Sequence, residues 1–152
     1  MTQIYFYHNI QDRLFAACRL IERAYQGGRR VLVLGAPTLL RELDLRLWSL
    51  NPTGFIPHVG LQSPLAMQTP VVLSQAMAPY LSQIQSQGDA LLDNAVLINL
   101  SDSLPDEFER FAWVMELVGH DDSERLSARQ RWRDYKAAGY PLHAKDYAQQ
   151  GA

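Results

Sequence analysis

The chain has 152 residues, of which 47% are hydrophobic and 20% are charged. This length suits one domain with a sizeable core, because two separate domains would each be marginally stable, and the composition excludes a wholly disordered chain. The formal net charge of -2 argues against a surface that grips DNA everywhere, since such surfaces are basic, but it leaves room for a local basic patch.

The single cysteine, Cys18, lies among small and apolar residues of a helical pattern, so we expect a buried thiol rather than a reactive one. One thiol forms no internal disulfide and offers no metal cluster. The first residues lack the basic and apolar regions of a signal peptide, and no apolar run approaches the ~20 residues of a membrane span. These features predict a cytoplasmic protein with no membrane partner.

The first third of the chain alternates between strand and helix patterns. Residues 4–7 are aromatic and β-rich, which is typical of a strand. Residues 12–26 carry apolar side chains at helical spacing and end at a glycine pair. Residues 30–35 form an apolar run ended by glycine, as in a strand buried on both faces of a parallel sheet, and residues 37–50 form a second helix. Such a succession predicts right-handed parallel connections.

The patterns in the middle of the chain are weaker. Residues 51–68 are rich in proline, glycine and polar side chains, so we expect a long surface loop. Residues 70–73 are a candidate strand, and residues 76–87 are weakly helical with an interruption at Pro79. Residues 94–100 form a strong strand pattern.

The last part of the chain ends in a well-marked helix. Residues 107–111 predict one or two helical turns, and residues 112–118 predict a strand or a continuation of the helix, with Glu116 as an exception among apolar residues. Residues 121–138 predict a helix, because acidic residues favour its start and a glycine and a proline follow its end. Residues 142–152 are expected to be irregular.

Together these elements predict the α/β class, as one three-layer domain over residues 1–152 with a mostly parallel central sheet flanked by helices. The arrangement is Rossmann-like but lacks a dinucleotide motif, because neither early strand–helix junction gives GxGxxG and no segment gives GxxxxGK[ST]. Residues 35–38 could still present amides to an anion, which keeps a small nucleotide-binding enzyme as the weakest hypothesis.

Other candidate sites favour structural roles. The histidines His8, His58, His120 and His143 share no metal-ligand spacing on one element, so we expect neither a metal site nor an acid–base pair. Residues 101–103 follow a strand where α/β folds place ligands, but a turn is the favoured interpretation. The chain has no GxSxG nucleophile motif, and we expect no cofactor.

The helix over residues 121–138 carries the clearest functional pattern. Arg125, Arg129, Trp132, Arg133 and Lys136 recur at intervals of three and four, so helical geometry places them along one stripe. From residue 125 to residue 136 there are five basic residues and one acidic residue, a local charge of +4 in a chain of net charge -2. This asymmetry indicates an anionic partner.

Three interpretations of the stripe stay open at this point. It is a solvated helix face, or Trp132 packs into the core, or the stripe binds a ligand. Arginines form paired bonds with carboxylates and an aromatic ring anchors apolar groups, so an acidic peptide that ends in a hydrophobic residue and a free carboxylate would suit it. A nucleic-acid backbone would suit it less specifically.

Several segments have a distinctive order and spacing. They are Ile-Tyr-Phe-Tyr at residues 4–7, Arg-Arg-Val-Leu-Val at 29–33, the block 43–48 leading into Phe-Ile-Pro-His at 55–58, and residues 128–140. In this arrangement the chain resembles the chi subunit family of the bacterial DNA polymerase III holoenzyme. The resemblance covers nearly the whole length and is poor between residues 61 and 94.

The resemblance implies an accessory subunit of the clamp-loader complex, without catalysis of its own, in a DNA-directed DNA polymerase that acts in DNA replication. Members of the family hold the acidic C-terminal tail, ending in phenylalanine, of the single-stranded-DNA-binding protein. They link it to the clamp loader through the psi subunit, so contact with DNA would be indirect.

The resemblance also implies roles for single residues. Arg129 matches an arginine that holds the carboxylate of the tail. Trp132 stands where a tyrosine is familiar and Arg133 where a lysine is familiar, so an aromatic wall and a cation are kept while the shape of the pocket and the hydrogen-bond geometry change. Phe55 and Val118 match apolar positions that line the pocket for the terminal phenylalanine.

Two further expectations concern partners. Trp48 and the loop after it are candidates for the psi contact, although core packing is the favoured interpretation of Trp48. The main alternative to peptide binding is a direct contact of the basic helix with single-stranded nucleic acid, which would show a steep dependence on salt.

Overall fold

The computed structural model describes residues 1–49, 55–86, 88 and 92–147. Its elements in chain order are β1 (Gln3–Ile10), α1 (Arg13–Gln26), β2 (Arg30–Leu34), α2 (Pro37–Ser49), β3 (His58–Gly60), the 3-10 turn η1 (Ala66–Gln68), β4 (Val71–Ser74), α3 (Met77–Gln85), β5 (Ala95–Asn99), the 3-10 turn η3 (Phe108–Arg110), β6 (Trp113–Gly119), α4 (Asp122–Ala137) and β7 (Leu142–Asp146). No helix within these ranges is both long enough and apolar enough to cross a membrane.

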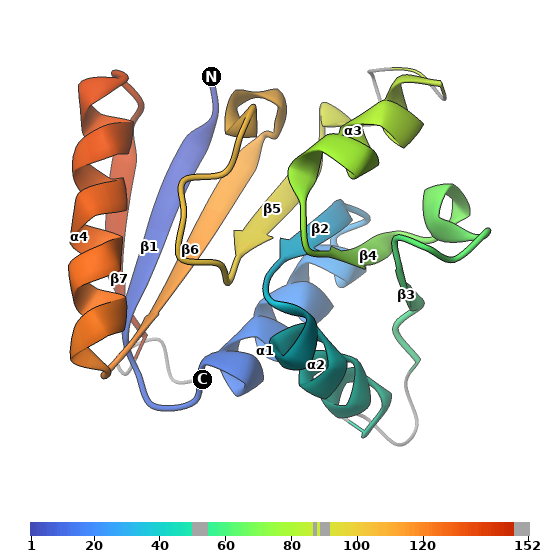
Figure 1. Cartoon of the computed structure of the whole chain (residues 1–152), viewed down its shortest axis with the longest axis horizontal. Helices are drawn as coiled ribbons and strands as arrows, with labels where there is room; N and C mark the ends of the chain where they lie inside the picture. Colours follow the sequence, from blue (N-terminus) through green and yellow to red (C-terminus); the bar gives the residue numbers. More distant parts are fainter. Residues whose placement is uncertain (50–54, 87, 89–91, 148–152) are drawn as a thin grey trace.

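The strands form one seven-stranded sheet in the order β3-β4-β2-β5-β6-β1-β7. Every pair of neighbouring strands is parallel. Figure 1 shows this order from β7 on the left to β3 on the right, with α4 beside the β7 end of the sheet. The predicted α/β class with a parallel sheet is therefore confirmed.

Two apolar clusters pack helices against the two faces of the sheet. Val31 and Val33 of β2 face the cluster that holds α1 and α2. Leu32, between them, faces the cluster that holds α3 and α4. Successive residues of a strand point to opposite faces, so the continuous apolar run of β2 is buried on both sides, and three layers result.

The C-terminal segment differs from the sequence-based prediction. Residues 142–152 were expected to be irregular, but Leu142–Asp146 forms β7, which pairs with β1 at the edge of the sheet. Its sequence has no β-branched residue, so its local preference for a strand is weak. Its backbone hydrogen bonds to β1 stabilise the strand instead. Residues 148–152 lie outside the described part of the chain.

The helix after β4 is continuous through Pro79, which was expected to interrupt it. α3 begins at Met77, so Pro79 lies in its first turn, where a backbone amide has no partner within the helix. The loop expected over residues 51–68 likewise contains the short edge strand β3 and the turn η1. Residues 50–54 lie outside the described residues.

A buried carboxylate ties α4 to the sheet. Glu116 of β6 is fully buried and accepts hydrogen bonds from Arg131 Nε at 2.9 Å, Asn99 Nδ2 at 2.9 Å and Tyr135 Oη at 2.7 Å. Burial raises the pKa of the Glu116 carboxyl, and the guanidinium of Arg131 opposes that shift. Glu116, the charged exception in the apolar run of β6, thus anchors α4 to the sheet.

This anchor fixes which face of α4 points inward. Ala128, Arg131 and Tyr135 are the buried residues of the helix, and their spacing of three and four places them on one side. One of the five basic residues in the sequence pattern, Arg131, is therefore taken up by the core. The remaining basic residues lie on the outward side.

We predict that Arg131→Met lowers the free energy of unfolding by about 3–5 kcal/mol, because it leaves the carboxylate of Glu116 buried without its cation. Urea denaturation followed by circular dichroism measures this change. Adding Glu116→Gln to the same variant should recover more than half of the loss, since an amide oxygen still accepts from Asn99 and Tyr135. A single variant as stable as the parent chain would contradict the prediction.

Candidate functional site

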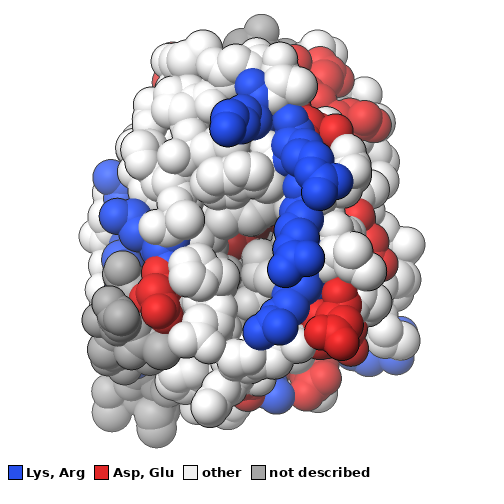
Figure 2. Space-filling view, turned by 90° about the vertical axis from the view of Figure 1, so that its left-hand side faces the viewer, with Lys and Arg blue, Asp and Glu red and all other residues white. Residues whose placement is uncertain are grey.

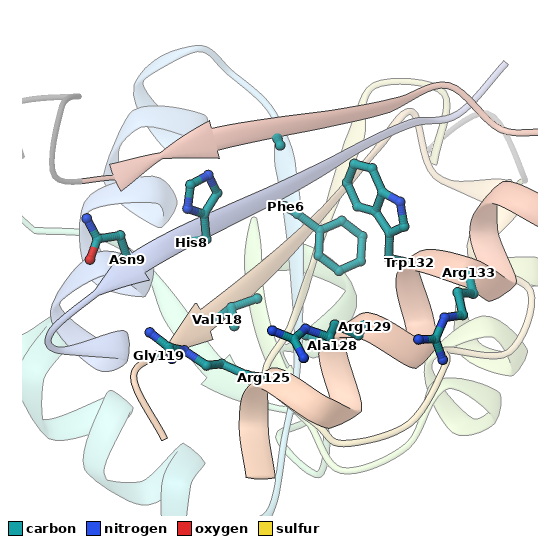
Figure 3. Close-up of a pocket in the computed structure, with 11 residues that line it drawn as sticks. Phe6, His8, Asn9, Val118, Gly119, Arg125, Ala128, Arg129, Trp132 and Arg133 are labelled. Carbon is teal, nitrogen blue, oxygen red and sulfur yellow. The ribbon is translucent and has the colours of Figure 1, made fainter. Parts of the chain in front are cut away.

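A hollow of about 470 Å³ opens where α4 runs alongside the carboxyl ends of β1 and β6. Figure 3 shows its walls, with strand residues on one side and α4 residues on the other. It is lined by Phe6, His8, Asn9, Val118, Gly119, Arg125, Ala128, Arg129, Trp132, Arg133 and Ala144. Parallel sheets expose ligand sites at such strand ends.

The floor of the hollow is apolar. Phe6, Val118 and Ala128 are buried beneath it. Trp132 is half-buried and meets the ring of Phe6 edge to face, with 5.1 Å between ring centroids. The indole is therefore neither sealed in the core nor free in solvent, and it forms an aromatic wall with one side open.

The rim along α4 is basic. Arg125, Arg129, Arg133 and Lys136 are exposed, and Figure 2 shows a column of basic side chains beside a hollowed surface that carries little charge. Arg129 has no hydrogen bond or ion pair with any other described residue. Arg125 lies 4.0 Å from Asp122, and Arg133 makes one long contact of 3.4 Å with Gln130. Their cationic groups are thus largely available to a ligand.

The start of α4 is held firmly against the end of β6. The carboxylate of Asp121 accepts from the hydroxyl of Ser123 at 2.6 Å and from the amides of Ser123 at 2.7 Å and Glu124 at 3.4 Å, and these bonds lower the pKa of Asp121. Glu124 in turn pairs with Arg13 of α1 at 2.8 Å and accepts from the Gly119 amide at 3.1 Å. The first turn of the basic column is therefore fixed in position.

The end of β1 forms the opposite wall. Asn9 has a positive φ of 63°, and the pairing register of β1 with β6 shifts between Tyr7 and Ile10. Such a bulge redirects side chains, and asparagine tolerates this backbone conformation. The Asn9 amide donates to Asp146 at 3.2 Å, so β7 supports this wall.

Four of the residues proposed from the sequence meet in the hollow: Arg129, Trp132, Arg133 and Val118. Phe55 does not line it. Its side chain is 60% exposed and packs against Trp48, with 5.2 Å between ring centroids. Phe55 is therefore not part of this hollow, unlike the four residues with which it was grouped.

The sequence-based site lacked the residues that β1 and β7 contribute. Those missed are Phe6, His8, Asn9, Gly119, Ala128 and Ala144, and Arg125 was seen only as part of the stripe. Strand alternation could have placed Phe6 and His8 on one face. Which strand lies beside β6 was not visible in the sequence, and β7 was not expected.

The remaining sequence candidates have structural roles. The Gly35 amide donates to the Ser74 carbonyl at 3.2 Å, so it is not free for an anion. Ser101 bonds through its amide and hydroxyl to Asn99 Oδ1, as a turn requires. Among the described residues no group of three or more histidine, cysteine, aspartate or glutamate side chains is placed to hold a metal ion.

A second surface feature lies on α2. Leu45 is 65% exposed and Trp48 is 55% exposed, and the ring of Trp48 lies tilted against His58 with 4.9 Å between ring centroids. The favoured expectation of core packing for Trp48 is therefore wrong. Together with Phe55 these side chains form an exposed apolar patch, here called the α2 patch, of the kind that marks a protein contact.

Comparison with known proteins shows the family of the chain. The family model described as "DNA polymerase III chi subunit, HolC" matches residues 1–143. The chain belongs to the DNA polymerase III chi subunit family. It is similar to the DNA polymerase III subunit chi of Pseudomonas aeruginosa, with 35% identity over 93% of this chain and 94% of the relative.

Two further chi subunits are similar over most of their length. The Haemophilus influenzae subunit is 28% identical over 86% of this chain and 84% of its own. The Escherichia coli subunit is 28% identical over 83% of this chain and 80% of its own. As a chi-family chain, the protein is an accessory subunit of a DNA polymerase III and takes part in DNA replication.

We predict that the basic rim of this chi-family chain contributes little to folding. Arg129→Ala and Arg133→Ala should each change the free energy of unfolding by less than about 0.5 kcal/mol, because both side chains are exposed and make no strong contact. Urea denaturation measures the free energy of unfolding of each variant. A loss above about 1 kcal/mol would assign these arginines a structural role instead.

Proposed function

We propose that the hollow beside α4 binds the acidic C-terminal tail of the single-stranded-DNA-binding protein, which ends in phenylalanine. The observation that carries this proposal is the alignment of three exposed arginines, Arg125, Arg129 and Arg133, with one apolar hollow and its indole wall. A cationic rim alone would suit any anion. The apolar floor selects an anion that also carries a hydrophobic end.

Each part of such a tail has a counterpart in the hollow. The phenyl ring enters between Phe6, Val118 and Trp132, and burial of a side chain of this size is worth about 1.5–3 kcal/mol. The terminal carboxylate pairs with Arg129, whose donors make no competing bond with the described residues. The acidic residues before it lie along Arg125 and Arg133.

The same chain would link this tail to the rest of the polymerase. The α2 patch is the proposed contact with the psi subunit, because grouped exposed aromatic and aliphatic side chains suit a protein partner. α2 and α4 lie at different ends of the sheet (Figure 1), so both partners could bind at once. This geometry suits an adaptor, which needs no chemical step of its own.

Arg129→Ala should weaken binding of a fluorescein-labelled tail peptide by about 1.5–3 kcal/mol, since it removes a charge-assisted bond to the carboxylate. Fluorescence anisotropy measures the affinity. Arg41→Ala, an exposed arginine on α2, is the matched control and should bind like the parent chain. A peptide without its terminal phenylalanine should bind far more weakly, and equal affinity for it would overturn the proposal.

The proposed psi contact is tested separately. Trp48→Ala combined with Phe55→Ala should abolish co-elution with the psi subunit in gel filtration, because the patch loses both exposed rings. The same double variant should bind the tail peptide within about twofold of the parent chain, as the α2 patch is not part of the hollow. Undiminished co-elution with psi would show that the partner binds elsewhere.

A further inference from the structure

A second groove lies on the opposite face of the sheet from the hollow. Tyr5 and Tyr7 of β1 point toward this face, whereas Phe6 and His8 point into the hollow. The groove measures about 230 Å³ and runs between α1 and strands β1 and β6. Its walls include Arg23 of α1, Arg29 before β2, and Tyr5, Trp113 and Met115 of the sheet.

The described residues cover the sheet only partly on this side. α1 leads from β1 to β2, with β6 and β5 between those strands, and it packs mainly on β2 and β6. Tyr5 of β1, Trp113 of β6 and His143 of β7 are consequently half-buried rather than sealed. A set of aromatic side chains therefore stays accessible on the face of parallel strands.

The aromatic rings are adjacent. Tyr5 stacks on His143 with 4.7 Å between ring centroids, and it lies 6.4 Å from Tyr7. β1 pairs with β6 and with β7 in register, so Gln3 is beside Trp113 and Tyr5 is beside His143. Rings carried on neighbouring strands form the kind of platform on which unpaired bases stack.

Cations surround these rings. The guanidinium of Arg29 lies 4.5 Å from the centre of the Trp113 ring, and Lys145 Nζ lies 5.9 Å from the centre of the Tyr5 ring. Arg23 is exposed at the edge of the groove. Within the described ranges, none of these three side chains forms an ion pair with a carboxylate. Figure 2 shows a group of basic side chains on the left, apart from the α4 column on the right.

We infer that this groove binds single-stranded DNA, with bases stacked on the rings at Tyr5 and Trp113 and phosphates neutralised by Arg23, Arg29 and Lys145. An acidic peptide without aromatic side chains would use the charges but leave the rings without a partner. A duplex would offer phosphates while its base faces stay stacked on one another. An unpaired strand uses both features of the groove, because it offers a base face and a phosphate at every nucleotide.

Fluorescence anisotropy with a labelled oligothymidylate tests this inference. The parent chain should bind at low salt, and the logarithm of its affinity should fall with the logarithm of salt with a slope of about -2, as expected for three phosphate contacts with a single strand. Arg23→Ala with Arg29→Ala should reduce the slope to about -0.7, since one cation remains. No binding at low salt would overturn the inference.

A matched pair of variants separates the groove from the α4 column. Arg125→Ala with Arg129→Ala removes the same charge from the other face, so it should bind the oligonucleotide at least tenfold more tightly than the Arg23 and Arg29 double variant. The reverse order would place the strand on α4 and overturn the inference. The tail-peptide assay should rank these variants oppositely, which keeps the two proposals distinguishable.

Stacking is tested apart from charge. Tyr5→Leu keeps an apolar side chain but removes the ring, and it should weaken oligonucleotide binding at least about fivefold with an unchanged salt slope. With Trp48→Phe and Trp132→Phe, Trp113 is the one remaining tryptophan of the three in the sequence. Its fluorescence should be quenched by the oligonucleotide, and an unchanged signal at saturation would contradict stacking at Trp113.

Discussion

The buried bond between Glu116 and Arg131 sets the geometry of the whole functional face. Arg131 Nε lies 2.9 Å from the carboxylate, both side chains are buried, and a buried charge left unpaired is strongly destabilising. Ala128 and Tyr135 are buried on the same side of α4 as Arg131 and pack into the apolar cluster there. The ion pair gives α4 one rotational setting, and that setting turns Arg125, Arg129 and Trp132 toward the end of β1.

Strand β1 lies between the two proposed anion sites and contributes side chains to both. Its even-numbered residue Phe6 forms the floor of the hollow, and its odd-numbered neighbour Tyr5 forms part of the groove on the other face. On the two proposals, one edge of the sheet contacts both the tail of a DNA-coating protein and the strand that this protein coats. Two weak contacts joined in this way raise the overall affinity without new contacts within either site.

The α2 patch differs from both sites in its chemistry. Leu45, Trp48 and Phe55 leave large apolar groups in water, an arrangement that a protein keeps when a partner covers it. On the proposed function, the α2 patch binds the partner on the polymerase side and the hollow beside α4 binds the partner on the DNA side, and the two elements lie apart in the fold (Figure 1). On that proposal, this separation gives the chain a physical basis for joining two assemblies.

Local sequence determined the elements that their own residues stabilise. The apolar run of β2, the capped start of α4 at Asp121 and the stripe of cations along that helix all follow from side-chain type and spacing. Tertiary structure decided the features that depend on contacts between segments distant in the sequence. β7 exists because β1 pairs with it, and Phe55 packs against Trp48 instead of lining the hollow. The hollow needs β1 next to β6, and no local pattern encodes which strands of a parallel sheet become neighbours.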